Sequence, residues 1–166
     1  MTEATKEVFL QENEFIVSKT DLTGRIVYTN QIFRRICGYS ERELLGQPHS
    51  LIRHPDMPRC IFKLLWDKLG ANEEIFAYVK NTCKDDSFYW VFAHVTPSFN
   101  EAGEKIGYHS NRRKPDLEGL ELIKPLYQRL LAIENSEVNK KTGMMKSYEF
   151  FQGLLSKYGM TYDQFI

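Results

Sequence analysis

The sequence predicts a fold that combines antiparallel strands with helices, and three observations support this prediction. Five segments have strand character, and short polar links join the last three of them, as antiparallel neighbours require. Short helical segments separate the second strand from the third. From Asp116 onward, apolar residues recur at helical spacing. The expected order is therefore two strands, several short helices, three strands and then further helices.

The first half of the chain contains a hairpin followed by short helices. The turn D-L-T-G joins the first two strands, which indicates a hairpin. Asn30 can then cap a helix that Gly38 stops, and S-E-R-E is a capping-box pattern. The expected elements are a short amphipathic helix near 4–11, strands over 14–18 and 25–29, a helix after Asn30 through Ile36, a helical turn after Ser40, a loop with three prolines over 47–59, and a helix over 60–69.

The second half begins with strands and ends with helices. The links K-D-D-S and N-E-A-G are short enough to make hairpins. After them, leucines and isoleucines share one face of a long helix. The expected elements are strands over 75–80, 88–96 and 105–112, a helix from Asp116 that includes Leu117, Leu120, Ile123, Leu126, Tyr127, Leu130 and Leu131, a polar break over 135–143, and a helix over about 147–158.

Composition restricts the classes of partner. The chain has 166 residues, with 22 Lys plus Arg and 22 Asp plus Glu, which gives a net charge of zero and argues against nucleic-acid binding. The first 14 residues lack an apolar run, and no stretch approaches the roughly 20 apolar residues of a membrane span. We therefore expect a cytoplasmic protein that meets a membrane only through a partner. Three widely spaced cysteines indicate buried free thiols: Cys37, Cys60 and Cys83.

Two segments are candidates for ligand binding. In the loop R-H-P-D-M-P, residues 53–58, two prolines stiffen the backbone around Arg53, His54 and Asp56, a set that suits a phosphate or a polar head group. The alternative is a self-satisfied loop in which Asp56 caps the next helix and pairs with Arg53. The second candidate is Asn81, which offers a ligand both a donor and an acceptor, unless it only forms a turn.

The chain from about Asn13 to Asp116 resembles a PAS domain. The resemblance rests on D-L-T-G-R-I-V-Y-T-N, then G-Y-S-E-R-E-L-L-G-Q, then D-D-S-F-Y-W-V, in that order. R-H-P-D-M-P after G-Q-P-H resembles, more narrowly, the PAS domain of bacterial aerotaxis receptors, which bind FAD. The implied fold is α+β, a five-stranded antiparallel sheet with short helices on one face and the flavin between them. The expected division is 1–12, an N-terminal helical cap; 13–116, the PAS sensor domain; and 117–166, a helical C-terminal extension.

The resemblance also implies which residues bind FAD. The family's flavin-associated motif falls on Arg53, His54 and Asp56, and LOV domains, which are flavin-binding PAS relatives, direct the residue aligned with Asn81 at the ring edge. His49 stands where LOV domains need a cysteine, which favours redox sensing over cysteinyl-flavin photochemistry. The complete set of expected cofactor-binding residues is Arg53, His54, Asp56, Trp66, Asn81, Asn30, His109 and Tyr89.

Alternation along the strands predicts two contrasting sheet faces. If Asn81 points inward, so do small residues such as Ala77, Val91 and Ala93, which leaves room for a flat ring. A core packed against large helix residues gives the same pattern. The other residues of the inward set are Ile75, Val79, Tyr89, Val95, Gly107 and His109. The outer face would then carry an aromatic cluster that needs cover. We expect part of this cover from the N-terminal segment and part from a second protein, either another PAS copy or a transducer. The cluster is Phe76, Tyr78, Trp90, Phe92 and Tyr108.

These observations lead to one interpretation and several alternatives. The chain is expected to be a stand-alone, cytoplasmic, FAD-containing redox sensor of energy taxis or aerotaxis. It would signal to a separate membrane-bound, methyl-accepting transducer with a HAMP domain, and would bind no metal. The alternatives are a haem sensor with His49, His54 or His94 as axial ligand, and a cofactor-free dimerisation module. A nucleophile with a base, a metal cluster and a phosphate loop are all lacking in the sequence, which argues against an enzyme.

Overall fold

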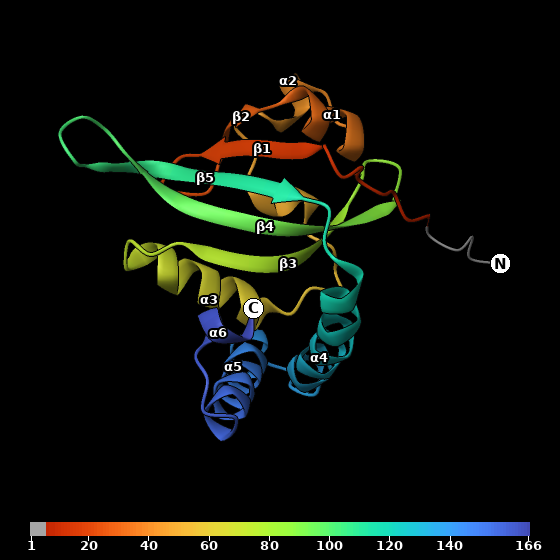
Figure 1. The fold of residues 1–166 in the computed structure, drawn as a ribbon, viewed down its shortest axis with the longest axis vertical. Coiled ribbons are helices and arrows are strands. Elements are labelled where there is room, and N and C mark those ends of the chain that lie inside the picture. The colour runs from red at the N-terminus through yellow and green to blue at the C-terminus, as the bar shows by residue number, and fades with distance from the viewer. Residues whose placement is uncertain (1–5) are drawn as a thin grey trace.

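A five-stranded antiparallel sheet organises the chain, and its strand order is β2-β1-β5-β4-β3 (Figure 1). The computed structural model describes residues 6–166. Each predicted strand is present, and β3 to β5 extend beyond their predicted ends. The five strands are β1 (Phe15–Thr20), β2 (Ile26–Thr29), β3 (Ile75–Thr82), β4 (Phe88–Phe99) and β5 (Lys105–Arg113).

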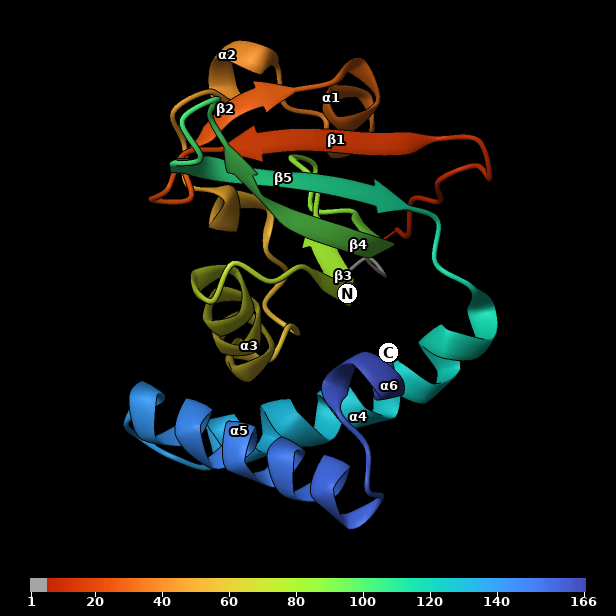
Figure 2. The same ribbon diagram turned by 60° about the vertical axis from the view of Figure 1, so that its left-hand side comes forward.

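Helices occupy two places in the molecule. Those between β2 and β3 cover one face of the sheet, here called the inner face, and those after β5 lie beside α3 and the β3 edge (Figures 1 and 2). Within residues 6–166, no helix is both long and apolar enough to cross a membrane. The inner helices are α1 (Gln31–Cys37), α2 (Glu41–Leu44), the 3-10 helix η1 (His49–Ile52) and α3 (Arg59–Gly70), and the C-terminal helices are α4 (Leu117–Asn135), α5 (Lys140–Lys157) and α6 (Tyr162–Phe165).

Local sequence signals set the ends of the first helices as predicted. Asn30 accepts a hydrogen bond from the backbone of Phe33, and Gly38 ends α1 in the left-handed region with φ of 78°. Ser40 and Glu43 form the reciprocal capping box at the start of α2. The interior between these helices and the sheet is apolar: Ile16, Ile26, Phe33, Leu44, Ile52, Ile61, Leu69 and Val91 are almost fully buried.

The expected N-terminal helical cap is wrong for residues 6–12. Residues 1–5 lie outside the part of the chain that the structure describes. Glu7 instead forms an isolated parallel bridge with Phe88. The Val8 N–H donates to the Phe88 carbonyl at 2.7 Å, and the Phe88 N–H donates to the Lys6 carbonyl at 3.0 Å. This segment prefers the extended form because it satisfies the free backbone groups at the start of β4 and buries Leu10.

The inward register predicted for β5 is also wrong by one residue. Val95 pairs with Ser110 and Ala93 pairs with Arg112, so these partners share the inner face. His109 pairs with Thr96 and Lys19 on the outer face. The prediction extended the alternation from Asn81 to β5 with an assumed register, whereas the hydrogen-bonded register with β4 decides which side chains face inward. Tyr108, Ser110 and Arg112 take the inward places that Gly107 and His109 were expected to fill.

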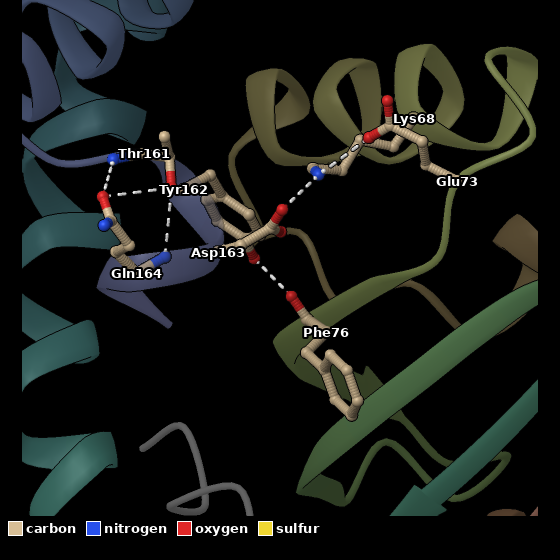
Figure 3. A network of polar contacts seen from close by, with 7 residues as sticks. All are labelled: Lys68, Glu73, Phe76, Thr161, Tyr162, Asp163 and Gln164. Atoms are coloured by element: carbon tan, nitrogen blue, oxygen red, sulfur yellow. Dashed lines mark hydrogen bonds and ion pairs between the residues drawn. The ribbon is translucent and has the colours of Figure 1, made fainter.

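The C-terminal helices cover much of the outer aromatic cluster. Trp90 lies beneath Tyr127 of α4, with ring centroids 6.2 Å apart, and Tyr78 is 6% exposed. Two tyrosine hydroxyls satisfy carbonyls on the free edge of β3: Tyr127 donates to Tyr78 at 2.7 Å and Tyr162 donates to Phe76 at 2.5 Å (Figure 3). Helices α4 and α6 therefore supply cover that was expected from the N-terminal segment and a second protein. Tyr108, which was assigned to this cluster, lies on the inner face.

The last long helix begins earlier than predicted. Helix α5 starts at Lys140, with Asn139 as its N-cap, so Gly143 lies inside the helix instead of in a polar break. A Cβ added at Gly143 would lie 2.4 Å from the Glu134 carbonyl oxygen of α4. Glycine is required at this position because the backbones of α4 and α5 approach closely, and not because the chain turns there.

Gly143→Ala should therefore destabilise the protein by about 1–3 kcal/mol, because the added methyl group meets backbone that has no room to yield. Gly153→Ala is the matched control in the same helix, where nothing lies within 4 Å of the added Cβ. That variant should be neutral or up to about 1 kcal/mol more stable. Urea unfolding of the two variants measures the difference, and equal stabilities would contradict the close approach of α4 and α5.

Candidate functional site

A cavity of about 220 Å³ lies between the inner face of the sheet and the helices η1 and α3. The exposed members of its lining are Thr23, Pro48, Ser50 and Trp66, so the cavity opens between the β1–β2 turn, η1 and α3. The deeper lining carries polar side chains from several elements. These are Ser18 and Thr20 of β1, His49 of η1, Arg53, Asn81 of β3, and Ser110 and Arg112 of β5.

Arg112 is the most unusual residue of the cavity. Its side chain is 2% exposed, and the side chains that line the cavity include no carboxylate. Its Nη2 donates to Ser18 Oγ at 2.6 Å, and its guanidinium lies 4.4 Å from the Phe33 ring centroid. Within residues 6–166, Nε and Nη1 have no hydrogen-bond partner. The protein therefore buries a cation whose remaining donors are free to bind a ligand.

Arg53 and Asn81 bring further free donors to the same cavity. The two residues form an isolated backbone bridge, which holds the end of the loop beside β3. Asn81 is 3% exposed and its Nδ2 has no partner among the described residues; the same holds for Arg53 Nε. The Arg53 guanidinium stacks on the Phe62 ring of α3 at 3.6 Å. Burial lowers the pKa of Arg53, yet an arginine keeps its charge in proteins.

Ser18 connects Arg112 to His49. Since Ser18 Oγ accepts from Arg112, its own hydrogen can be donated to His49 Nε2, which lies 3.0 Å away. Burial, followed by the charge of Arg112, lowers the pKa of His49 to about 3. His49 is therefore neutral at ordinary pH. The result is a directed chain of hydrogen bonds from β5 through β1 to η1.

The structure brings together three of the residues predicted from the sequence: Arg53, Asn81 and Trp66. Trp66 is 42% exposed at the mouth of the cavity, where its ring meets Tyr108 edge to face at 5.3 Å. Sequence reasoning missed Arg112 and Ser18. The signal for Arg112 was the pattern of β5, in which Tyr108, Ser110 and Arg112 alternate, but an arginine at such a position is normally solvated.

His54 and Asp56 do not line the cavity with Arg53. The His54 N–H donates to the Lys80 carbonyl at 3.2 Å, and Asp56 pairs with Lys80 Nζ at 2.7 Å. The hydrogen bond from Lys80 lowers the pKa of Asp56. The side chains of Asp56 and Lys80 face a groove beside α4 on the outer side of the sheet. The proline-rich loop thus braces the edge of β3, and Asp56 pairs with Lys80 instead of Arg53.

Three other predicted residues lie outside the cavity lining. Asn30 uses its side-chain oxygen for the N–H groups of Val17 and Phe33, and its Nδ2 for the Phe15 carbonyl, so its amide is fully engaged in the backbone. Tyr89 is fully buried behind the cavity, and burial raises the pKa of its hydroxyl while Arg112 opposes this. His109 lies on the outer face of the sheet, as described above.

The arrangement favours an electron-rich, flat ligand. Two arginines and one amide offer donors, and the absence of a carboxylate among the lining side chains makes the cavity positive. The walls beside these groups are apolar, formed by Phe62, Leu65, Val79, Ala93 and Val95. Such a cavity can bind the hydrogen-bond acceptors at one edge of a ring system and can stabilise negative charge that develops there.

Comparisons with known proteins agree on one fold. Residues 26–111 match the family described as the PAS fold. The aerotaxis receptor of Escherichia coli (strain K12) is 38% identical over 128 residues, which cover 77% of this chain and 25% of that receptor. The nitrogen fixation regulatory protein of Klebsiella pneumoniae is 30% identical over 104 residues, 63% of this chain and 21% of that protein. The chain therefore spans about a quarter or less of the length of these relatives.

A solved structure gives the same result for the fold. It belongs to a light-oxygen-voltage domain studied with a flavin analogue. The two structures match with a TM-score of 0.57 at 21% identity, over 69% of this chain and 86% of that chain.

Stability should fall as the pH drops from 7 to 5, in part through His49. Unfolded His49 has a pKa near 6.5 and takes up a proton in this range, whereas folded His49, with a pKa of about 3, does not. This side chain alone should therefore lower the free energy of unfolding by about 2 kcal/mol between these pH values. Urea unfolding of the wild type and His49→Gln at both pH values measures the effect. The variant should lose about 2 kcal/mol less than the wild type, and an equal loss would contradict a His49 that stays neutral in the folded protein.

Proposed function

The chain belongs to the PAS family, and from this premise we propose that its cavity binds a flavin, specifically FAD, and that the protein is a redox sensor and not an enzyme. The observation that carries the proposal is that three residues lining one cavity, Arg53, Asn81 and Arg112, each carry a buried nitrogen with no hydrogen-bond partner among residues 6–166. A flavin ring presents several acceptors and one donor along its polar edge. The Asn81 amide can donate to an acceptor and accept from the donor, whereas the two arginines can donate to the acceptors.

The size of the cavity supports a division of the cofactor into two parts. Its volume of about 220 Å³ is below the roughly 300–1,000 Å³ of sites that enclose a drug-sized ligand. A single flat ring system is therefore the part that enters, after modest adjustment of the walls. The rest of FAD would extend through the mouth, where the half-exposed indole of Trp66 offers a stacking surface. In this arrangement His54 and Asp56 support the site by fixing the loop, and Arg53 makes the contact.

A bound flavin would supply reversible uptake of electrons and protons. The residues of this chain would convert such a change in charge into a change in hydrogen bonding. Negative charge in the cavity attracts the guanidinium of Arg112, which competes with its bond to Ser18. When that bond weakens, Ser18 and its partner His49 are released to rearrange, and η1 receives the signal.

The output of the sensor is proposed to be a protein contact. The aerotaxis receptor of Escherichia coli is a relative at 38% identity, which supports a role in energy taxis or aerotaxis. We propose that the chain acts in the cytoplasm and signals to a membrane-bound, HAMP-containing transducer. The outer face of the sheet is the proposed contact, because Phe92 and His94 remain partly exposed there after α4 has covered Tyr78 and Trp90.

The absorption spectrum of the purified protein tests the cofactor assignment. We expect flavin bands, whereas a Soret band would indicate haem and no chromophore after reconstitution with FAD would indicate a cofactor-free module. Arg53→Ala and Arg112→Met should each lower the flavin content of folded protein several-fold, because each removes a charged donor from the cavity, roughly 1.5–3 kcal/mol per bond. His109→Ala, on the outer face, is the control and should keep full flavin content. Full content in both arginine variants would refute the assignment of the cavity.

Phe92→Glu tests the proposed contact. On the outer face, the Phe92 ring stacks on Phe76, with centroids 5.7 Å apart, and meets the Tyr78 ring at a tilt, with centroids 4.9 Å apart. A charge at this position should abolish self-association or transducer binding in sedimentation and pull-down assays while the flavin spectrum stays unchanged. Ile106→Glu, at an exposed position on the β4–β5 hairpin, is the control. Unchanged assembly in Phe92→Glu would move the contact away from this face.

A further inference from the structure

Helix α3 is the wall that the cavity shares with the C-terminal helices. Phe62, Leu65, Trp66 and Leu69 of α3 line the cavity. The opposite side of the helix meets the α4–α5 hairpin, and Figure 2 shows α3 between this hairpin and the sheet. A change in the position of α3 therefore alters both the cavity and the surface on which the α4–α5 hairpin packs.

The first turn of α3 lacks a cap of its own and obtains one from α4. Its N-cap residue is Pro58, whose side chain makes no hydrogen bond. The carboxylate of Glu134 accepts from the backbone N–H groups of Arg59 and Cys60, each at 2.9 Å. Glu134 lies 75 residues from Arg59 in the chain. A negative group at this position also stabilises the positive end of the helix dipole.

Glu134 is held in place by α5 as well. Its side chain is 1% exposed, and Ser147 Oγ donates to its Oε1 at 2.8 Å. One turn earlier, Gly143 of α5 lies against the Glu134 backbone, as described above. Arg59 Nε, 3.4 Å from Oε2, compensates the charge. Three helices, α3, α4 and α5, thus meet at one buried carboxylate.

The far end of α3 is tied to the same C-terminal unit. Lys68, in the last turn, pairs with Asp163 of α6 at 3.0 Å and with Glu73 at 3.2 Å (Figure 3). Tyr162, next to Asp163, donates to the Phe76 carbonyl of β3. The C-terminal helices therefore hold both ends of the cavity wall, with a buried contact at its start and an exposed one at its end.

We propose that Glu134 is a positioning residue that couples the occupancy of the cavity to the docking of the α4–α5 hairpin on α3. The proposal rests on the proposed function and adds the route of communication. This route runs from the cavity through α3 to the junction where Glu134 of α4 contacts the first turn of α3 and Ser147 of α5. Coupling of this kind is reciprocal: a ligand that fixes α3 stabilises the docked hairpin, and a docked hairpin raises the affinity for the ligand by the same factor.

Glu134→Gln is the variant that isolates the junction. The amide keeps the size of the side chain, but its NH2 group cannot accept from the N–H groups of α3, so one of them loses its partner. Ser147→Ala is a milder second variant, which removes one bond to the carboxylate and remains useful if Glu134→Gln folds poorly. Glu137→Gln is the matched control, because Glu137 forms an ion pair with Lys146 of α5 at the surface and does not contact α3.

The test measures FAD affinity by fluorescence titration, and hydrogen exchange with and without FAD, on the full chain. In the wild type, FAD should protect the amides of α5 around residues 143–150 as well as those of α3. Glu134→Gln should bind FAD roughly 5-fold or more weakly and lose the α5 protection, and Ser147→Ala should change both in the same direction. Glu137→Gln should resemble the wild type. A merely structural Glu134 would not abolish protection of α5 by a ligand bound on the other side of α3.

Two results would overturn the coupling while the proposed function stands: wild-type protein that binds FAD without any change in α5 exchange, or Glu134→Gln with unchanged affinity and protection. If the wild type binds no FAD, the proposed function fails and the coupling fails with it, an outcome distinct from FAD binding without any change in α5 exchange.

Discussion

The burial of Arg112 without a carboxylate is the constraint on which the rest of the site depends. A guanidinium removed from water requires hydrogen bonds and a favourable electrostatic setting. Ser18 accepts one of the hydrogen bonds of Arg112, and the ring of Phe33 provides a cation–π contact. These two contacts fix the side chains of β1 and α1 around β5. Among residues 6–166, Nε and Nη1 of Arg112 have no hydrogen-bond partner, and its side chain helps to line the cavity. His49 stays neutral because its burial, and then the same charge on Arg112, lower its pKa.

Strand β3 organises the other half of the molecule. One side of the strand pairs with β4, and its free side is satisfied by groups from three separate segments: the Tyr127 and Tyr162 hydroxyls and the His54 backbone. The proline-rich loop therefore places Arg53 in the cavity because its neighbours are attached to the β3 edge. This also explains why the C-terminal helices lie at the edge of the sheet and beside α3, where they shield main-chain groups that would otherwise attract another strand.

Elements governed by local signals could be predicted from the sequence, and long-range contacts could not. The cap at Asn30, the capping box at Ser40 and the strand pattern of β3 each follow from neighbouring residues. The family resemblance singled out Arg53 and Asn81 separately, and the structure shows that both line one cavity. The N-terminal segment became extended because of Phe88, eighty residues away, and Gly143 served packing against Glu134. Neither partner is visible in the local sequence. Arg112 and Glu134 were missed because their contacts are also distant in the sequence, and because charged residues are normally solvated.

The positions of the two tryptophans give the protein separate optical reporters. Trp66 lies at the mouth of the cavity on the inner side of the sheet, and Trp90 lies under Tyr127 on the outer side. The emission of Trp66 is open to water and sensitive to energy transfer to any coloured ligand in the cavity. The emission of Trp90 reports instead on the packing of α4 against the sheet. Single-tryptophan variants would therefore let intrinsic fluorescence follow the two sides of the sheet independently, in real time and without a label.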